Sequence, residues 1–442
     1  METELTLPEL QSMVEMAGTI NSEVFYWWCT GLMVIIHAGF LAYEMGASRQ
    51  KNVLASGVKN ILAFAFIVPT FYFFGWWIYL AMYQGFTPDY AAGAGGLPWS
   101  TSMGPNLADN ASGIFWGAFV LFAATTASIF SGAVIERIRV GSFLILAILL
   151  GSVAWILGAS WGWHPDGWLT TEWGFHDFGA AGCVHMVAGF FALGVLINLG
   201  PRNGRFTENG KPVDLQGHSV PMSTIGLMLI IVGFFGFLGG CIIYNNGAQW
   251  TTIFGTPVTL SAISFNTLMA FSGGIIGAYI VTRQPFWMMS GALAGIFAAA
   301  PGLDLYYPAL AFLLGVTAGV AVPVVDKFIT RAMKIDDAVG AFAVHGFGGL
   351  IGIVALGIFS GFPNVAGPEI SFLGQLKSAL VMALLGFIPG FAVSFVMARL
   401  KILRVPPNAE IVGLDTVEVP LPAYPEAVPA ITNGHTPAPN AA

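Results

Sequence analysis

The stretch that decides the fold is Asp177-Phe-Gly-Ala-Ala-Gly-Cys-Val-His185, an acid and an imidazole in a segment that is otherwise apolar as far as Gly200. The same frame returns later as Asp337-Ala-Val-Gly-Ala-Phe-Ala-Val-His345, with the same step of eight residues from Asp to His. On a helix, eight residues span roughly 12 Å and return to nearly the same face. The two frames therefore predict an internal repeat, with an acid near one end of each copy and a histidine near mid-membrane.

The composition indicates a membrane protein with many spans. Of the 442 residues, 56% are hydrophobic and only 9% are charged, and the mean hydropathy is +0.76. The formal net charge of −7 is carried almost wholly by loops and tails, and no nucleic-acid partner is expected. The cysteines fall in apolar segments and are expected to be packing residues, namely Cys29, Cys183 and Cys241.

Eleven apolar stretches are long enough to cross a bilayer, for which a helix needs about 20 residues. We expect them at 24–46, 56–84, 112–135, 141–163, 178–200, 220–244, 258–282, 286–302, 305–325, 338–360 and 374–398. An odd number of spans puts the two termini on opposite sides of the membrane.

The basic residues predict the orientation. Apart from Lys377, they lie in one set of alternate loops or in the C-terminal tail, Lys51 and Lys59 among them. None lies in the opposite set of loops, which covers 85–111, 164–176, 245–257, 303–304 and 361–373. The positive-inside rule therefore places the N-terminus outside and the C-terminus in the cytoplasm.

This orientation makes the two halves of the membrane domain antiparallel. The halves, about 24–200 and about 220–360, cross in opposite senses, so Asp177 is expected outside and Asp337 inside. Inverted repeats of this kind place their binding residues near the midplane. The expected fold class is all-α integral membrane, with eleven transmembrane helices arranged as inverted five-helix repeats plus an eleventh helix at about 374–398.

Two terminal segments flank the membrane domain at 24–400. Residues 1–23 are acidic and contain no Lys or Arg, so we expect an extracytoplasmic N-terminal tail rather than a signal peptide. Residues 401–442 are expected to form a Pro-rich cytoplasmic tail that is mostly disordered beyond Pro406. The chain is thus expected to be a multi-pass protein of the cell membrane.

Each polar residue also has a structural interpretation. Asp177 and Asp337 stand at helix starts, where Asp commonly caps the N-terminus. Taken singly, His185 or His345 could be a packing histidine. Two imidazoles without a third ligand fit no zinc site, so no metal or cofactor is expected. An intramembrane hydrolase built on Asp and His would lack a nucleophile, and no enzyme is expected.

Together these motifs resemble the ammonium transporter (Amt/Rh) family, and within it the Amt branch. The resemblance covers about residues 24–400 and rests on the Asp177 stretch with His185-Met-Val-Ala-Gly189, Asp336-Asp337 with Val344-His345-Gly346, Glu136-Arg-Ile-Arg139, Lys51-Asn52 and Gly236-Phe237. It implies a homotrimer with one narrow hydrophobic pore per subunit. It also implies an aromatic site that recruits ammonium at the outer mouth, two stacked phenylalanines beneath it, and twin histidines lining the pore.

The resemblance assigns roles by position. The pore residues that it implies are His185, His345, Phe122 and Phe237. The recruitment residues that it implies are Trp163, Phe122, Asp177 and Cys241, and Asp337 is implied to be structural. The implied function is recruitment of NH4+, deprotonation, and passage of NH3 with proton relay.

Three departures from the family pattern open an alternative. Many members read Phe-Asn-x-Gly-Ser where this chain has Phe237-Leu-Gly-Gly-Cys241, so a thiol, a weak hydrogen-bond partner, replaces a hydroxyl. Gly340 replaces an Asp of many bacterial members. The tail keeps Gly413-Leu-Asp415 but lacks the His-Gly-Glu of relatives that P-II-type regulators control. The alternative is an ammonium sensor that conducts poorly and signals through its tail.

Overall fold

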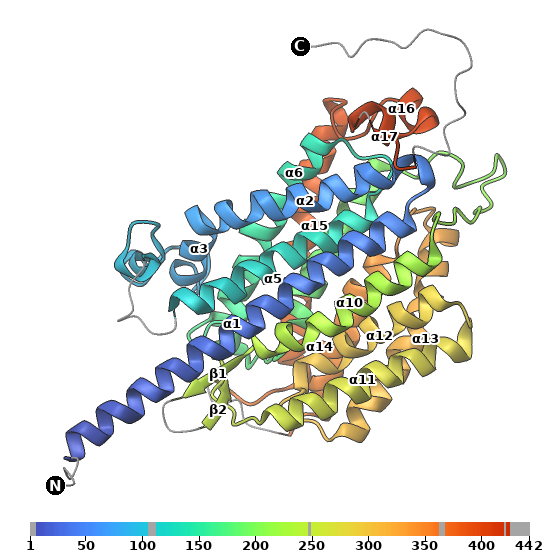
Figure 1. Ribbon diagram of the computed structural model, residues 1–442. Helices are drawn as coiled ribbons and strands as arrows, with labels where there is room; N and C mark the ends of the chain where they lie inside the picture. The colour runs from blue at the N-terminus through green and yellow to red at the C-terminus, as the bar shows by residue number, and fades with distance from the viewer. Residues whose placement is uncertain (1–5, 105–111, 246–248, 362–366, 420, 425–442) are drawn as a thin grey trace.

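The computed structural model describes residues 6–104, 112–245, 249–361, 367–419 and 421–424 as a bundle of long helices (Figure 1). Ten helices in these ranges are long and apolar enough to cross a membrane. The remaining expected span, 286–302, is the 15-residue helix α12 (Pro285–Ala299), which continues into the 3₁₀ turn η7 (Ala300–Gly302). The architecture therefore agrees with the expected eleven-helix membrane fold.

The five spans of the first repeat include three that are assembled from consecutive segments. They are α1 (Leu7–Ala47); α2 (Val53–Thr70) with η2 (Phe71–Gly75) and α3 (Trp76–Ala81); α5 (Ser112–Ala133); α6 (Val140–Leu149) with η5 (Leu150–Ala154) and α7 (Trp155–Gly162); and η6 (Ala181–Met186) with α9 (Val187–Leu199).

The second repeat begins at α10, and α15 follows it as the eleventh span, packed against α9 and α14. The spans are α10 (Val220–Gly239), α11 (Leu260–Val281), α12 with η7, α13 (Pro308–Ala332), η8 (Phe342–Phe347) with α14 (Gly348–Phe359), and α15 (Phe372–Arg399). Short elements complete the chain: η1 (Gln50–Asn52), α4 (Tyr90–Gly93), η3 (Ala94–Gly96), η4 (Thr101–Met103), α8 (Trp168–Trp173), the antiparallel strands β1 (Ile242–Asn245) and β2 (Gln249–Thr252), α16 (Pro407–Val412) and α17 (Leu414–Glu418).

Glycines let the leading helices of the two repeats, α1 and α10, lie side by side. A Cβ at Gly226 of α10 would collide with the backbone of Tyr43 in α1. At Gly274 of α11, a Cβ would collide with the backbone of Gly291 in α12. Small residues permit this close approach of membrane helices, where packing and not water exclusion drives association.

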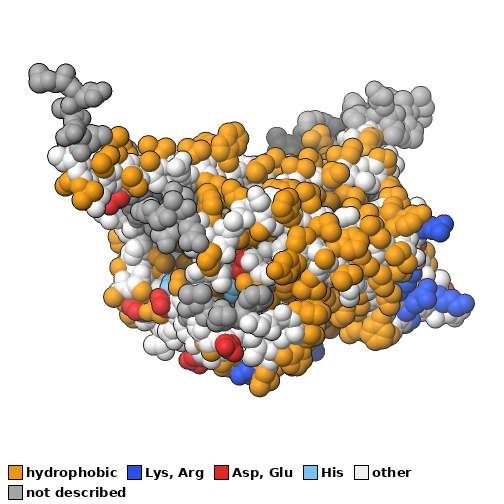
Figure 2. Space-filling model, turned by 90° about the horizontal axis from the view of Figure 1, so that it is seen from below, with side chains coloured by type: hydrophobic (Ala, Val, Ile, Leu, Met, Phe, Trp, Pro, Cys, Tyr) orange, Lys and Arg blue, Asp and Glu red, His pale blue; other side chains and the backbone are white. Residues whose placement is uncertain are grey.

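The outer surface agrees with a membrane-embedded band. Figure 2 shows one face on which hydrophobic side chains cover the middle, while most of the visible Lys and Arg side chains gather at one end. The N-terminal end of α1 and the helices α16 and α17 lie at opposite ends of the bundle (Figure 1). Lys377 is the basic residue outside the predicted pattern, and its Nζ lies 4.4 Å from the ring centroid of Trp173.

The C-terminal tail departs from the expectation of disorder beyond Pro406. Residues 407–418 form α16 and α17, and the carboxylate of Asp415 accepts hydrogen bonds from the backbone N–H groups of Leu54 (3.1 Å) and Ala55 (2.8 Å). These N–H groups belong to the first turn of α2, where a helix has no internal acceptors for them. The tail is ordered here because its acid caps a membrane helix.

Candidate functional site

Each candidate histidine lies in a π-helical turn at the start of the fifth span of its repeat. In the first repeat, Ala180 has a left-handed backbone with φ of 62°, and η6, which contains His185, follows at once. In the second repeat, Gly340 has φ of 70°, and η8, which contains His345, begins two residues later. π turns are rare and frequently mark functional sites. The sequence echo is therefore an echo in backbone geometry as well.

The two histidines contact each other directly. His185 Nδ1 lies 3.0 Å from His345 Nδ1, and the ring centroids are 5.2 Å apart. One of these nitrogens must donate and the other accept, because both are in hydrogen-bond range. His185 is fully buried, and its Nε2 has no hydrogen-bond partner among the described residues. This nitrogen is available to a small polar molecule.

Aromatic side chains enclose the histidine pair. The ring of Phe297 stacks on His185 with centroids 3.7 Å apart, and it also lies 4.7 Å from the ring of His345. Phe237 and Phe234 pack on His185 at 5.6 and 5.9 Å. The imidazoles thus sit in a low-dielectric wall in which a charged species would lack solvation.

Phe122 and Phe237 meet as expected, but their rings are not parallel. The centroids are 4.4 Å apart at an interplanar angle of 80°, an edge-to-face contact rather than the implied stack. Aromatic quadrupoles favour this arrangement over a face-to-face sandwich. Phe122 also meets Trp163 edge to face, at 5.1 Å. The structure therefore forms a continuous aromatic path from Trp163 through both phenylalanines to His185.

Trp163 lies at the end of α7 and is only 1% exposed. Its carbonyl accepts a hydrogen bond from the Tyr79 hydroxyl at 3.1 Å, which holds the backbone in place. Its indole Nε1 has no hydrogen-bond partner within the described part of the chain. An unsatisfied buried donor of this kind is uncommon and expensive.

Asp177 is a buried cap. Its carboxylate accepts hydrogen bonds from the backbone N–H groups of Ala181, Gly182 and Cys183 at 2.8, 2.8 and 3.0 Å. This geometry matches the capping interpretation, and it fixes the turn that carries His185. Any contribution of Asp177 to cation recruitment acts through its charge.

Asp337 occupies the matching place in the second repeat. Its Oδ2 accepts from the Phe342 N–H at 2.8 Å, while Oδ1 is buried without a partner among the described residues. Burial raises the pKa of Asp337. A Cβ at Gly340 would lie 2.9 Å from the ring of Trp287. The left-handed backbone and this contact explain why glycine fits the position.

Cys241 lies just beyond α10 and is 2% exposed. Its thiol donates to the carbonyl of Phe237 at 3.3 Å, so the sulfur is held by its own turn. A Cβ at the preceding residue, Gly240, would lie 3.3 Å from Phe122 Cζ. The turn that carries Cys241 therefore packs against the aromatic path.

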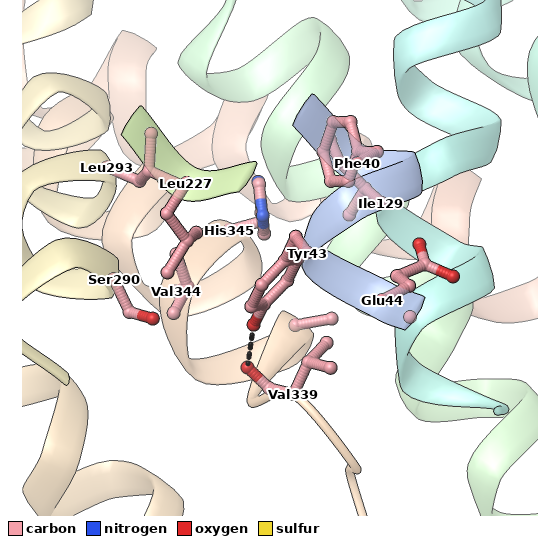
Figure 3. Close-up of a pocket in the computed structure, with 12 residues that line it drawn as sticks. Phe40, Tyr43, Glu44, Ile129, Leu227, Ser290, Leu293, Val339, Val344 and His345 are labelled. Carbon is pink, nitrogen blue, oxygen red and sulfur yellow. Dashed lines mark hydrogen bonds between the residues drawn. The ribbon is translucent and has the colours of Figure 1, made fainter. Parts of the chain in front are cut away.

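A small cavity is lined by His345 and by residues of α1, α5, α10 and α12 (Figure 3). Its volume of about 10 Å³ is close to what one water molecule needs. Tyr43 points into this region from α1, and its hydroxyl donates to the carbonyl of Val339 at 3.4 Å. Glu44, Gly132 and Ser290 also contribute to the lining.

Charged groups at the basic end of the bundle are paired. The guanidinium of Arg202 binds both oxygens of Asp336, at 2.9 and 3.0 Å, and Arg137 donates to the Asp336 carbonyl at 2.6 Å. Burial works against the charged carboxylate, but Arg137 and Arg202 hold the pKa of Asp336 below its usual range. Breaking such a buried pair is strongly destabilising, which indicates a structural role.

A second polar cluster lies toward the opposite end of the bundle. His176 Nε2 lies 3.0 Å from a carboxylate oxygen of Asp304, and this oxygen accepts from the Thr256 hydroxyl at 2.7 Å. The backbone N–H of His176 donates to Gln375 at 3.0 Å. The cluster ties three loops and α15 together next to Asp177. Within the described ranges, no group of three or more His, Cys, Asp or Glu side chains could hold a metal ion.

Sequence reasoning missed three contributors to this region. Phe297 stacks on His185, but nothing in its sequence context separates it from the other 35 phenylalanines, since the chain has 36. Lys59 belongs to the basic pattern that predicts loops, but it lies in α2 and is fully buried. Glu44 lies inside α1 and is also fully buried. Both charges stand in apolar spans, a signal that could have identified them.

Comparisons with known proteins place the chain among transporters. The model of the Ammonium Transporter Family matches residues 24–424. The chain is 32% identical over 404 residues to ammonium transporter Amt1 of Methanocaldococcus jannaschii, covering 91% of this chain and 96% of the relative. It is 34% identical over 423 residues to a putative ammonium transporter of Synechocystis, covering 93% and 90%.

Solved structures give the same result for the fold. A structure described as a sensor Amt protein aligns with a TM-score of 0.78 at 25% identity, covering 91% of this chain and 99% of that chain. Mep2 of Candida albicans aligns with a TM-score of 0.72 at 22% identity, covering 88% and 86%.

Proposed function

Because this chain belongs to the ammonium transporter family, we propose that it moves ammonium across the cell membrane. It captures NH4+ at its outer aromatic site, removes a proton, and passes NH3 along the hydrophobic path to the histidine pair. The proton crosses separately through the imidazoles. It is a multi-pass membrane transporter and not an enzyme.

Energetics favour deprotonation over passage of the cation. Placing an unpaired ammonium in a low-dielectric pore costs tens of kcal/mol by a Born argument. Taking the lysine pKa of about 10.4 as a surrogate, proton loss at neutral pH costs roughly three pKa units, or about 4–5 kcal/mol. A potassium ion has no proton to lose and stays excluded. This difference supplies selectivity without a ring of carbonyl ligands.

The outer residues suit recruitment of a cation. Trp163 and Phe122 are adjacent aromatic rings, and each can attract an ammonium ion over its face by about 0.5–2 kcal/mol. The buried carboxylate of Asp177 adds negative potential nearby. Phe122 and Phe237 then exclude water below this site, so that a neutral molecule is the species that continues.

The observation that carries the proposal is the contact between His185 and His345 inside the aromatic wall. Imidazole can both donate and accept a proton near neutral pH, which suits a relay. The free Nε2 of His185 can orient ammonia at the same time. The path of ammonia and the path of the proton share the pore and separate at the two histidines.

Three further features belong to this proposal. We place the N-terminus outside and the C-terminus in the cytoplasm, because nearly all basic residues lie in one set of alternate loops or in the C-terminal tail. We assign a homotrimer with one pore per subunit, as the family resemblance implies. A P-II-type regulator would bind the ordered tail that Asp415 attaches to α2.

A sensor is the second candidate. The Cys241 thiol, a weak hydrogen-bond partner, stands where many family members have a hydroxyl, and it donates to the Phe237 carbonyl. The chain is also similar in fold to a sensor Amt protein. A sensor would bind ammonium and carry little current, and would signal through α16 and α17.

Current recording on purified protein in liposomes separates these candidates. Under an inward ammonium gradient, we expect an inward current that is absent in protein-free liposomes and absent with potassium in place of ammonium. Ammonia uptake without current would indicate a passive channel. Neither uptake nor current, with ammonium binding retained, would indicate the sensor and refute the transporter.

A further inference from the structure

Glu44 is a buried acid that the pore mechanism above does not use. It lies in α1 beside the cavity that His345 lines, and its side chain is fully buried (Figure 3). An ionisable group at this depth is a functional candidate by default. A role in proton transfer requires that its hydrogen-bond partners suit both the ionised and the protonated carboxyl group.

The hydrogen bonds of Glu44 are complete in either state. Asn60 Nδ2 donates to Glu44 Oε2 at 2.8 Å, and the Ser131 hydroxyl contacts Oε1. The same hydroxyl lies 2.8 Å from the carbonyl of Ser128. When Glu44 is ionised, Ser131 donates to it. When Glu44 is protonated, it donates to Ser131, and Ser131 turns to Ser128, since a hydroxyl both donates and accepts.

A buried positive charge that acts on Glu44 comes from α2. Lys59 is fully buried, and its Nζ has no hydrogen-bond partner among the described residues. It acts on Glu44 through space and offsets the cost of burying the carboxylate. Asn60 on α2 and Ser131 on α5 complete the surroundings of an acid that can lose and regain a proton while its own carboxyl oxygens keep their hydrogen bonds.

The carboxylate borders the cavity at Gly132. A Cβ there would lie 3.4 Å from Glu44 Oε1 and 2.8 Å from Val339 Cγ2, and Gly132 and Val339 both line the cavity with His345. The missing side chain therefore leaves the route between the cavity and the carboxylate open. One water molecule in this space could bridge the imidazole and the acid.

From this placement we propose that Glu44 is the proton acceptor on the cytoplasmic side of the histidine pair. An N–H bond of protonated His345 breaks as the cavity water gains a proton, and an O–H bond of that water breaks as the Glu44 carboxylate gains one. Glu44 then releases the proton to water on the cytoplasmic side and returns to its ionised form. One positive charge moves inward, and no oxidant or further reactant is needed.

This relay rests on the proposed transport function, and the rival role for Glu44 is a purely structural one that joins α1, α2 and α5. Glu44→Gln separates the two roles, because an amide can still pair with Asn60 and Ser131 but cannot take up the proton. Glu44→Asp keeps the acid. Glu15→Gln is the matched control, an exposed acid of the same helix. Gly132→Ala narrows the route without changing any titratable group.

Ammonium currents of these variants in liposomes, in H2O and D2O, test the relay. We expect the Glu44→Gln current to fall about tenfold or more, as for loss of a proton-transfer group, at an unchanged unfolding temperature. Glu44→Asp should recover part of the current and keep the solvent isotope effect. Glu15→Gln should match the wild type, and Gly132→Ala should lower the current.

A wild-type current in Glu44→Gln would overturn the relay and leave the transport function intact. Should Glu44→Gln fail to fold, an undiminished current in Gly132→Ala would overturn it instead. The absence of current in the wild type would refute electrogenic transport itself, and the relay with it.

Discussion

At the scale of single residues, the pore depends on which groups have no hydrogen-bond partner. His185 and His345 each use Nδ1 on the other ring, so His185 Nε2 is left facing the aromatic wall. The indole N–H of Trp163 likewise finds no hydrogen-bond partner among the residues that the structure describes. Buried polar atoms without partners are costly, and their presence along one path is consistent with a substrate that supplies the missing bonds.

Cys241→Ser tests whether the residue at this position faces the cation. A serine oxygen is a better acceptor than sulfur, so the variant should bind ammonium more tightly by about 0.5–1.5 kcal/mol, the net value of one hydrogen bond. Half-saturation of the ammonium current measures this change. An unaltered half-saturation would show that Cys241 contributes only its bond to the Phe237 carbonyl.

Substitution of Phe122 and of Phe237 by alanine should impair transport in different ways. Phe237 packs on His185, and Phe237→Ala should admit water and alkali cations and lower the ratio of ammonium to potassium current. Phe122 lies beside Trp163, and Phe122→Ala should mainly weaken capture of the cation, by about 0.5–2 kcal/mol. Both currents are measured in the same liposomes. Undiminished selectivity in Phe237→Ala would contradict its role as the barrier.

At the scale of elements, the two repeats share the same backbone conformation before their π turns. The turns before η6 and η8 both pass through a left-handed residue, filled by Ala180 in one copy and by Gly340 in the other. For a residue with a side chain this conformation costs roughly 1–2 kcal/mol. Gly340 meets the conformational need without cost, whereas Ala180 stores strain next to a functional turn.

Substitutions at these two positions should have opposite effects. Gly340→Ala should lower the free energy of unfolding by about 1–3 kcal/mol, through backbone strain and the close contact with Trp287. Ala180→Gly should raise it, by up to about 1 kcal/mol. Thermal unfolding of the purified variants in one detergent checks both. A Gly340→Ala protein as stable as the wild type would show that the turn relaxes, and the strain argument would be wrong.

The limits of prediction from sequence also lie at the scale of elements. The apolar stretches, the paired histidines and the contact between Phe122 and Phe237 could be inferred, since length, periodic pattern and matched motifs carry them. The π turns could not, because no composition rule distinguishes them from an α-helix. The helices of the tail could not be inferred, because their order depends on a contact between Asp415 and the start of α2. These residues lie far apart in the sequence.

At the scale of the whole molecule, two inverted repeats bring both histidines to one place although 160 residues separate them. The same inversion puts Asp177 and Asp337 at the starts of equivalent helices that run in opposite directions. The basic residues at one end of the bundle (Figure 2) distinguish its two ends. A symmetric scaffold thereby carries an asymmetric path, aromatic above the histidines and lined by Tyr43 and Glu44 below them.

In the proposed mechanism, the ammonium ion loses its proton, and both the ammonia and the proton cross the membrane. The charge carried per ammonium molecule tests it most directly, measured in one set of liposomes as integrated current against ammonium taken up. We expect one elementary charge for each ammonium in the wild type, and a lower ratio in His185→Ala, whose ammonia path persists without the relay. A wild-type ratio of zero, with uptake intact, would contradict the account and establish a passive ammonia channel.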